Sequence, residues 1–337
     1  MKNIPDYIDY LLKPTAYPHE AGDVELVQTH ISFVVLAGDY VYKWKKPVNF
    51  GFVDFSTLAR RKHFCEEELR LNRRLCPGIY LGVTWLSLEK GGFRLEGKGE
   101  VVEYAVKMAR MPEEKMMSRI IGAGGVGKEH LDRIVDLLVP FYRQAEGGER
   151  VRMNGRAQAV AHNIYDNFAQ TARFVGGEAL STGRFARIKA YAEGFLAREE
   201  LFTARIAAGR VRDCHGDLYS GNICLDEGIH IFDCIEFNDK LRFIDCAADV
   251  AFLAMDLDFH GHTGLSDYFI ERFLTASGDP GLPQMLNFYK CYRAYVRGKV
   301  GLLTADDPAL DPEKAEAAMA AAAKYFQLAE TYAERQG

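Results

Sequence analysis

The chain has 337 residues, 48% of them hydrophobic, and carries 42 lysines and arginines against 47 aspartates and glutamates. This is ordinary globular composition, and the formal net charge of −5 argues against a nucleic-acid-binding protein. No apolar run approaches the roughly 20 residues of a membrane helix, and the N-terminal segment is acidic and interrupted by proline, so we expect no signal peptide or membrane anchor. The seven cysteines form no C-x-x-C pair, which predicts reduced thiols in a cytoplasmic protein.

The first third of the chain is predicted to be rich in β-structure. A short helix near 4–12 precedes two Val/Tyr/Phe-rich runs at 24–31 and 32–44, and the Ala-Gly-Asp turn around Gly38 predicts a β-hairpin within the second run. Residues 55–75 have helical periodicity, with Ser56 as the expected N-cap. Further strands are expected at 80–88, 94–95 and 101–108.

Beyond Pro112 the pattern becomes helical, apart from a strand island at 223–235. Asp311 as N-cap and Pro312 at the first helical position predict the start of the last helix. The expected helices lie near 113–121, 129–145, 155–175, 183–206, 265–276, 283–302 and 312–335. We therefore predict an α+β protein with a small β-rich lobe at 1–111 and a larger helical lobe at 112–337.

Negative charge is concentrated in one segment of the second lobe. Residues 213–258 hold eleven carboxylates, but only Lys240 and Arg242 as basic residues. The segment is also rich in Ile, Phe, Leu, Val and Cys, so we expect it to be buried. Buried carboxylates need partners, and metal ions are the commonest way to satisfy many of them together.

The sequence His-Gly-Asp-Leu-Tyr-Ser-Gly-Asn at 215–222, followed by Ile-Phe-Asp at 231–233, carries the chemistry. Asp217 can accept the proton of a substrate hydroxyl, while Asn222 and Asp233 can supply oxygen ligands to a Mg²⁺ that bridges phosphates. A strand hairpin between Asn222 and Asp233 would bring both ligands to one edge. Without Asn222 and Asp233, the His-Gly-Asp sequence would equally fit a simple turn with a capping aspartate.

These motifs resemble the catalytic loop and metal-binding segment of the aminoglycoside phosphotransferase and choline kinase family, within the protein-kinase-like superfamily. The sequences of segments 29–58 and 66–75 resemble an uncharacterised bacterial branch of this family, whose members are often fused to a P-loop ATP-binding domain. The resemblance implies a two-lobed protein-kinase-like fold, with an antiparallel β-rich N-lobe and a mainly helical C-lobe. It also implies ATP and Mg²⁺ as cofactors and transfer of the γ-phosphate of ATP to a hydroxyl group of a small molecule.

The resemblance gives Asp217 the role of catalytic base and makes Asn222 and Asp233 the ligands of Mg²⁺. The family presents a lysine from its third strand to the α- and β-phosphates, and three lysines at 43, 45 and 46 compete for this role. Strand alternation puts Lys43 and Lys45 on one face. Lys43 follows an apolar run as the family's lysine does, so we choose Lys43, with Lys45 as the alternative.

The lysine's partner should be a glutamate on the following helix, where Glu66, Glu67 and Glu68 compete. The distance to Leu75 matches the family best for Glu68, with Glu67 as the alternative.

Nucleotide contacts are also implied by the resemblance. The phosphate-covering turn at 28–32 lacks glycine, so the hydroxyls of Thr29 and Ser32 and backbone N–H groups are expected to serve instead. The choice between ATP and GTP therefore stays open. The segment 106–111, which includes Met108 and Met111, resembles the linker whose backbone pairs with adenine.

Other polar features of the chain have structural explanations. The Gly-x-x-x-x-Gly-Lys sequence at 122–128 is followed by Glu129 where a P-loop needs serine or threonine, so a loop between helices is expected. Asp249 is expected to brace the catalytic loop and Arg242 to pair with Asp245. The acids at 256 and 258 are expected at an exposed helix end.

The acidic second lobe favours a cationic acceptor such as an amino sugar, with neither nucleic acid nor membrane as partner. Two alternatives to a small-molecule kinase stay open: a nucleotide-binding pseudokinase or regulatory scaffold, and a kinase that acts on protein.

Overall fold

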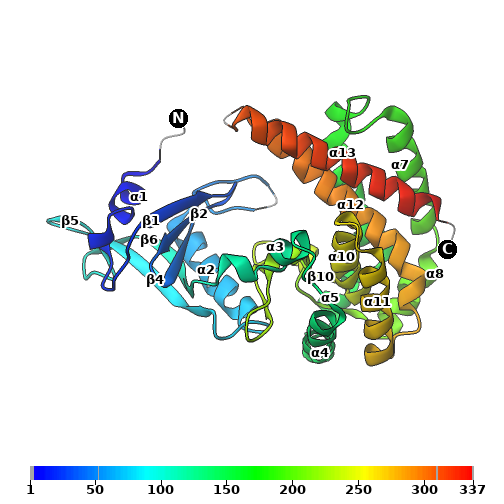
Figure 1. The fold of residues 1–337 in the computed structure, drawn as a ribbon, viewed down its shortest axis with the longest axis horizontal. Coiled ribbons are helices and arrows are strands. Elements are labelled where there is room, and N and C mark those ends of the chain that lie inside the picture. Colours follow the sequence, from blue (N-terminus) through cyan, green and yellow to red (C-terminus); the bar gives the residue numbers. More distant parts are fainter. Residues whose placement is uncertain (1–3, 52, 309, 336–337) are drawn as a thin grey trace. The chain divides into compact units, whose positions relative to one another are not determined.

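The computed structural model describes residues 4–51, 53–308 and 310–335, and the chain divides into two compact units (Figure 1). The first unit runs to Arg119 and also includes Asn222–Asp239, while the second comprises Ile120–Gly221 and the residues from Lys240 onward. The segment after the His-Gly-Asp motif thus packs with the N-terminal unit. The functional boundary expected at 111/112 stays a prediction.

An antiparallel sheet forms the body of the first unit. Its strand order is β1-β2-β3-β6-β4-β5. These strands are β1 (Val24–Gln28), β2 (Ser32–Ala37), β3 (Tyr40–Lys45), β4 (Tyr80–Glu89), β5 (Gly92–Leu95) and β6 (Glu100–Ala109). The predicted hairpin is confirmed as β2 and β3. Its turn needs a glycine because Gly38 has φ +58° and a Cβ there would lie 2.4 Å from the carbonyl oxygen of Glu20.

Alternation along β3 gives the two faces of this sheet different roles. Tyr42 and Trp44 are fully buried in the apolar cluster that includes Ile8 of α1 (Asp6–Leu11). Lys43 and Lys45 point to the opposite face, toward α2 (Leu58–Asn72), as the strand period requires. A one-residue shift in register would exchange aromatic and charged side chains, so the register is firmly specified.

Helix α2 begins one residue later than an N-cap at Ser56 predicts. Thr57, and not the expected Ser56, is the N-cap, because its hydroxyl accepts a hydrogen bond from the N–H of Arg60. Ser56 instead hydrogen-bonds Asp54 through both its backbone N–H and its hydroxyl. The capping signal was therefore read one residue too early.

A small hairpin completes the first unit. Strands β8 (Ile223–Cys224) and β9 (His230–Ile231) pair antiparallel, and Cys224 also bridges Met116 near the 3-10 helix η2 (Glu113–Lys115). The predicted strand island is thus present, although its strands are shorter than expected. A 3-10 helix, η1 (Pro14–Ala16), follows α1 at the other end of the unit.

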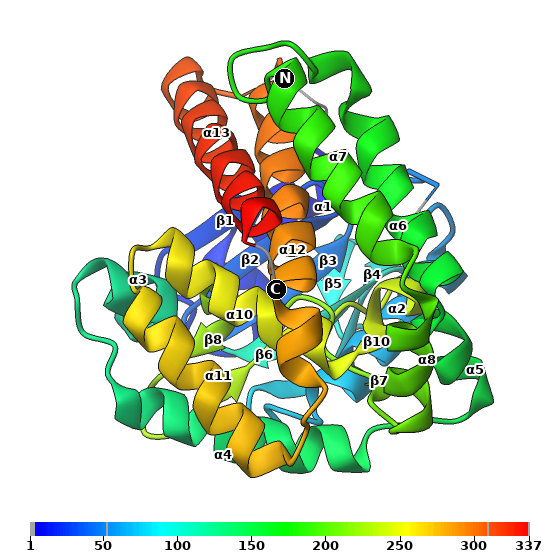
Figure 2. The same ribbon diagram turned by 90° about the vertical axis from the view of Figure 1, so that its right-hand side faces the viewer.

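The second unit is mainly helical, and its long helices α12 and α13 pack side by side, with α10 against α12 and α11 against α4 (Figure 2). The helices of this part of the chain are α3 (Met117–Gly122), α4 (Lys128–Gln144), α5 (Glu149–Arg152), α6 (Ala157–Thr171), α7 (Thr182–Leu196), α8 (Glu199–Ala207), α9 (Asp239–Arg242), α10 (Cys246–Phe259), α11 (Thr263–Ser277), α12 (Leu282–Ala305) and α13 (Pro312–Glu334). Between them lie η3 (Met153–Gly155), η4 (Ala172–Phe174), η5 (Ser220–Asn222) and the paired strands β7 (Val211–Asp213) and β10 (Phe243–Asp245).

Most helix predictions are confirmed, including Asp311 as the N-cap of α13 and the loop between α3 and α4 in place of a P-loop. The single helix expected at 183–206 is wrong, because the chain forms α7 and α8 with a break at Arg198. Glu199 and Glu200 occupy the first turn of α8, where negative charge stabilises a helix N-terminus. These two acids were the missed signal of a new start.

No helix in the described ranges is long and apolar enough to cross a membrane.

Candidate active site

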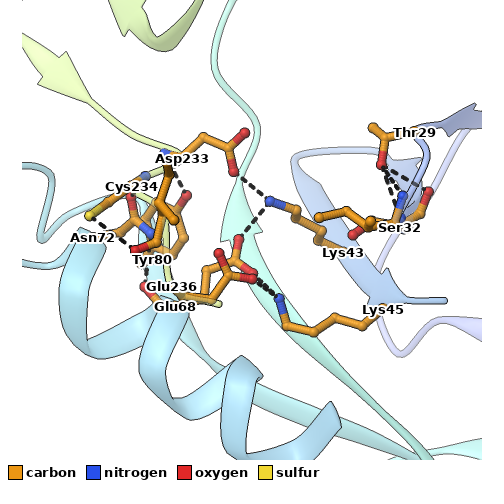
Figure 3. Close-up of polar contacts among 12 residues, drawn as sticks. Thr29, Ser32, Lys43, Lys45, Glu68, Asn72, Tyr80, Asp233, Cys234 and Glu236 are labelled. Atoms are coloured by element: carbon orange, nitrogen blue, oxygen red, sulfur yellow. Dashed lines mark hydrogen bonds and ion pairs between the residues drawn. The ribbon is translucent and has the colours of Figure 1, made fainter. Parts of the chain in front are cut away.

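A cluster of charged side chains lies between the sheet of the first unit, helix α2 and the segment that follows β9 (Figure 3). The ammonium group of Lys43 lies 2.8 Å from Oε1 of Glu68 and 2.5 Å from Oδ1 of Asp233. The ammonium group of Lys45 lies 2.7 Å from Oε2 of Glu68 and also contacts Glu236. One glutamate therefore binds both lysines, one with each carboxylate oxygen.

The two lysines differ in exposure. The side chain of Lys43 is 14% exposed and that of Lys45 is fully buried, whereas Asp233 is 44% exposed. Lys43 and Asp233 thus form the solvent-facing part of the cluster, and Lys45 forms its interior. The competing Glu67 pairs with Arg70 on the surface of α2, which leaves Glu68 as the partner of both lysines.

Two opposing effects set the pKa values in the cluster: burial disfavours the charged form of each group, and pairing with an opposite charge favours it. Burial by itself raises the pKa of Glu68, but the attraction of Lys43 and Lys45 outweighs it and lowers this pKa to about 2. Burial raises the pKa of Glu236 above its ordinary value. The pKa of Lys43 is well above its usual range, because the nearby carboxylates of Asp233 and Glu68 outweigh its desolvation. Glu68 is therefore an anion throughout the neutral range.

Asn222 and Asp233 occupy the two ends of the β8–β9 hairpin. The N–H of Phe232 donates to the carbonyl oxygen of Asn222 at 3.0 Å, so the residue before Asp233 lies directly opposite Asn222. The hairpin predicted between these residues is confirmed. An amide oxygen and a carboxylate are hard donors that fit Mg²⁺, which keeps several waters and needs few protein ligands. The described residues contain no cluster of three or more His, Cys, Asp or Glu side chains suited to a metal.

The glycine-free turn between β1 and β2 is closed by its own side chain. The hydroxyl of Thr29 accepts hydrogen bonds from the N–H groups of Ile31 at 3.3 Å and Ser32 at 2.9 Å. The Ser32 hydroxyl is buried and has no hydrogen-bond partner among the described residues. Lys46, just past the end of β3, donates to the carbonyl oxygen of Thr29 at 2.6 Å. The Thr29 hydroxyl thus closes the turn, and the N–H groups of Thr29, Ile31 and Ser32 all donate hydrogen bonds within it.

The two methionines of the expected adenine linker are placed differently. Met108 lies inside the sheet, opposite Val41 of β3 and Tyr80 of β4, so its backbone faces neighbouring strands. Met111 lies beyond the end of β6 and packs against the apolar cluster around Tyr80. The position of Met111 therefore suits a backbone contact to a base better than that of Met108.

In the second unit, Asp249 of α10 holds the start of the loop at 215–222, which carries Asp217. Its fully buried carboxylate accepts hydrogen bonds from the N–H groups of His215 and Gly216, both at 2.9 Å, and from the hydroxyl of Tyr142 at 3.0 Å. Arg293 of α12 donates to the carbonyl oxygen of Gly216 at 3.0 Å. The expectation that Asp249 braces this loop is confirmed.

The rest of the loop is fixed by further buried groups. Nδ1 of His215 accepts from the N–H of Asp217 at 3.3 Å, consistent with a bracing histidine. Asp256 accepts from the N–H of Ser220 at 3.0 Å. The loop that carries Asp217 is thus held at both ends from α10.

The acids at 256 and 258 were expected at an exposed helix end, and this is wrong. Asp256 is 2% exposed, and Asp258 accepts from Lys290 at 2.9 Å and from the hydroxyl of Tyr332. Lys290 belongs to α12 and Tyr332 to α13, so these two helices cover the polar end of α10.

The predicted pairing of Arg242 with Asp245 is also wrong. Asp245 accepts two hydrogen bonds of 2.7 Å from Arg205 of α8, while Arg242 pairs with Asp213, 2.5 Å away. The antiparallel pairing of β7 with β10 sets Asp213 opposite Phe243, beside Arg242. Several carboxylates of the acidic segment are therefore paired with arginine and lysine side chains of the protein. The charge of the segment gives no separate argument for a cationic acceptor.

Sequence reasoning missed the Lys45–Glu236 contact. Lys45 was considered only as a substitute for Lys43, and Glu236 was one of many acids. No local pattern signals this contact, because Glu236 lies 191 residues from Lys45 in the chain.

No family model matches the chain. Uncharacterized proteins of Mycobacterium tuberculosis H37Rv and Mycobacterium bovis are each 37% identical to it over 279 residues, which is 82% of the chain. The alignment covers 54% of those proteins, so the chain spans about half the length of the curated relatives it matches.

Solved structures identify the fold. A choline/ethanolamine kinase family protein from Mesorhizobium loti is 14% identical and superposes with a TM-score of 0.51, covering 98% of this chain and 99% of that one. The GDP complex of aminoglycoside 2′-phosphotransferase-IIIa is 11% identical, with a TM-score of 0.53 and coverage of 95% and 98%. The chain therefore has the two-lobed, protein-kinase-like α+β fold. In particular, it is the form shared by aminoglycoside phosphotransferases and choline/ethanolamine kinases, as the sequence motifs predict.

Proposed function

We propose that this protein is a Mg²⁺-dependent phosphotransferase that moves the γ-phosphoryl group of ATP to a hydroxyl of a small molecule, within the aminoglycoside phosphotransferase and choline kinase family. The observation that carries the proposal is the position of Lys43, whose ammonium group binds both Glu68 and Asp233. A strand lysine, a helix glutamate and an aspartate after the loop motif are the parts that phosphoryl transfer needs.

Nucleotide binding is assigned to the first unit. Lys43 would donate hydrogen bonds to the α- and β-phosphates, held in place by Glu68. Asn222 and Asp233 would hold Mg²⁺. When bound, this ion would neutralise negative charge on the β- and γ-phosphates. The backbone near Met111 is assigned to the base.

Asp217 is proposed to accept the proton of the acceptor hydroxyl as that oxygen attacks phosphorus. The surrounding loop is fixed by Asp249, Arg293 and Asp256, so little motion is needed to place the carboxylate. Phosphoryl transfer depends mostly on positioning and charge stabilisation, and a loop held by buried hydrogen bonds provides the first of these.

The acceptor is proposed to be a small alcohol that also carries an amine. The names of the two solved relatives, an aminoglycoside phosphotransferase and a choline/ethanolamine kinase family protein, support this class. All the cysteines are buried free thiols, which supports a cytoplasmic location. One relative binds GDP, so GTP is tested beside ATP as donor.

Calorimetry with two variants tests the assignment of roles. We expect Asp217→Ala to bind Mg·ATP as tightly as the wild type, because Asp217 is assigned to the acceptor. We expect Asp233→Ala to bind ATP with the same affinity whether Mg²⁺ or EDTA is present. Wild-type-like stimulation by Mg²⁺ in Asp233→Ala would refute the metal role.

A further inference from the structure

The backbone of Asp233 is in the left-handed conformation, which is strained for any residue with a side chain. Its φ is +61°, and among the described residues Glu96 is the other non-glycine residue with positive φ. Such a strained conformation persists where neighbouring groups enforce it.

Two side chains hold the backbone at this point (Figure 3). The N–H of Asp233 donates to the hydroxyl of Tyr80 at 3.2 Å, and the N–H of Cys234 donates to Oδ1 of Asn72 at 2.9 Å. The amide of Asn72 in turn donates to the carbonyl oxygen of Glu68, one turn earlier in α2, at 2.9 Å. The segment is therefore attached to the helix that also presents Glu68 to the lysines.

The far end of the same segment is attached by charge. Glu236 is 4% exposed at its side chain and contacts the ammonium group of Lys45, whose own side chain is fully buried. Lys45 also binds Oε2 of Glu68. A buried ion pair adds little net stability, because an apolar pair of similar volume often stabilises the folded protein as much or more. A specific position for the segment is a better reason for these charges.

We propose that Lys45 and Glu236 are positioning residues for the metal ligand Asp233: their ion pair fixes residues 233–236 against β3 and α2, so that the Asp233 carboxylate is held ready for Mg²⁺. This inference rests on the proposed function. The two lysines of β3 then divide the work. Lys43, partly exposed, exchanges its contact with Asp233 for the phosphates, while Lys45 stays bound in the interior.

The test compares two buried glutamates of the first unit. Glu236→Gln removes the charge that binds Lys45, and Glu103→Gln removes the charge of another buried pair, in which Arg61 lies 2.8 Å from Glu103. Glu103 is 3% exposed and contacts neither lysine in the cluster. A double variant, Lys45→Met with Glu236→Met, removes both charges together and protects the test against failure of Glu236→Gln to fold.

Two measurements are made on each folded variant. Calorimetry gives the metal coupling, defined as the ratio of the ATP dissociation constants in EDTA and in Mg²⁺. Amide hydrogen exchange reports on the N–H groups of Asp233 and Cys234. We expect Glu236→Gln and the double variant to lose about tenfold or more in metal coupling and to exchange these two amides faster. Glu103→Gln should retain both properties, whatever its melting temperature.

The outcomes separate this inference from the proposed function. Wild-type coupling and exchange in the Glu236 variants, or equal losses in Glu103→Gln, would overturn the positioning role. Absence of metal coupling in the wild type would overturn the metal site itself, and with it both proposals.

Discussion

Replacement of Asp249 by alanine tests how firmly the loop that carries Asp217 is held. The buried carboxylate accepts hydrogen bonds from the N–H groups of His215 and Gly216 and from the hydroxyl of Tyr142. Each buried polar group left without its partner costs about 1–3 kcal/mol, so three such groups predict a loss of roughly 3–6 kcal/mol after relaxation. Because domains are stable by only about 5–15 kcal/mol, Asp249→Ala should lose much of the stability of the helical unit.

Urea unfolding followed by far-UV circular dichroism measures this loss. Tyr142→Phe is the matched control, because it removes one of the three donors and leaves the two backbone hydrogen bonds. It should cost about 1 kcal/mol. A loss below about 1 kcal/mol in Asp249→Ala, or equal losses in the two variants, would refute the reasoning.

Three further predictions concern stability. Lys45→Met should lower the free energy of unfolding in urea by about 3–5 kcal/mol, because it leaves Glu236 buried and unpaired. Lys43→Met should cost clearly less, and the reverse order would contradict the assignment of Lys45 to the interior and Lys43 to the solvent-facing part of the cluster. In thermal melts, Gly298→Ala should destabilise by about 1–3 kcal/mol, since its Cβ would meet the Phe326 ring at 2.8 Å, whereas Gly194→Ala, in open space on α7, should stabilise by about 0.5–1 kcal/mol. Burial by itself raises the pKa of Glu330, but the nearby Arg184 and Arg187 outweigh it and lower this pKa. The wild type should therefore be more stable than Glu330→Gln at neutral pH and should lose that advantage as the pH falls through the folded-state pKa. A stability difference that stays constant across this pH range would contradict the prediction.

The sequence alone predicted the local structure around the candidate site well. The spacing of Asp217, Asn222 and Asp233 predicted a loop followed by a hairpin, and the hairpin is present. These predictions succeed because turn residues and short apolar strands determine local structure. Strand alternation likewise placed Lys43 and Lys45 on one face, which is the face toward α2.

Alternation could not separate the roles of those two lysines. Both reach Glu68, and their difference arises from depth in the interior and from Glu236, which lies 191 residues from Lys45 in the chain. A contact at such a separation depends on the folded backbone, and no local pattern encodes it.

The same limit explains the wrong partners in the acidic segment. Arg242 is close to Asp245 in sequence, but the pairing of β7 with β10 gives it Asp213 instead. Asp258 follows an apolar helix and looks like an exposed end until Lys290 of α12 covers it. In each case the choice of partner belongs to tertiary structure, which local charge spacing does not determine.

The central claim is transfer of a phosphoryl group to a small alcohol, and one measurement tests it most directly. Purified protein is incubated with Mg·ATP or Mg·GTP and a library of small hydroxyl compounds rich in amines, and mass spectrometry searches for products. We predict an acceptor heavier by one phosphoryl group, formed by the wild type and not by Asp217→Ala. Nucleotide binding without any phosphorylated acceptor, or equal product from Asp217→Ala, would contradict the account.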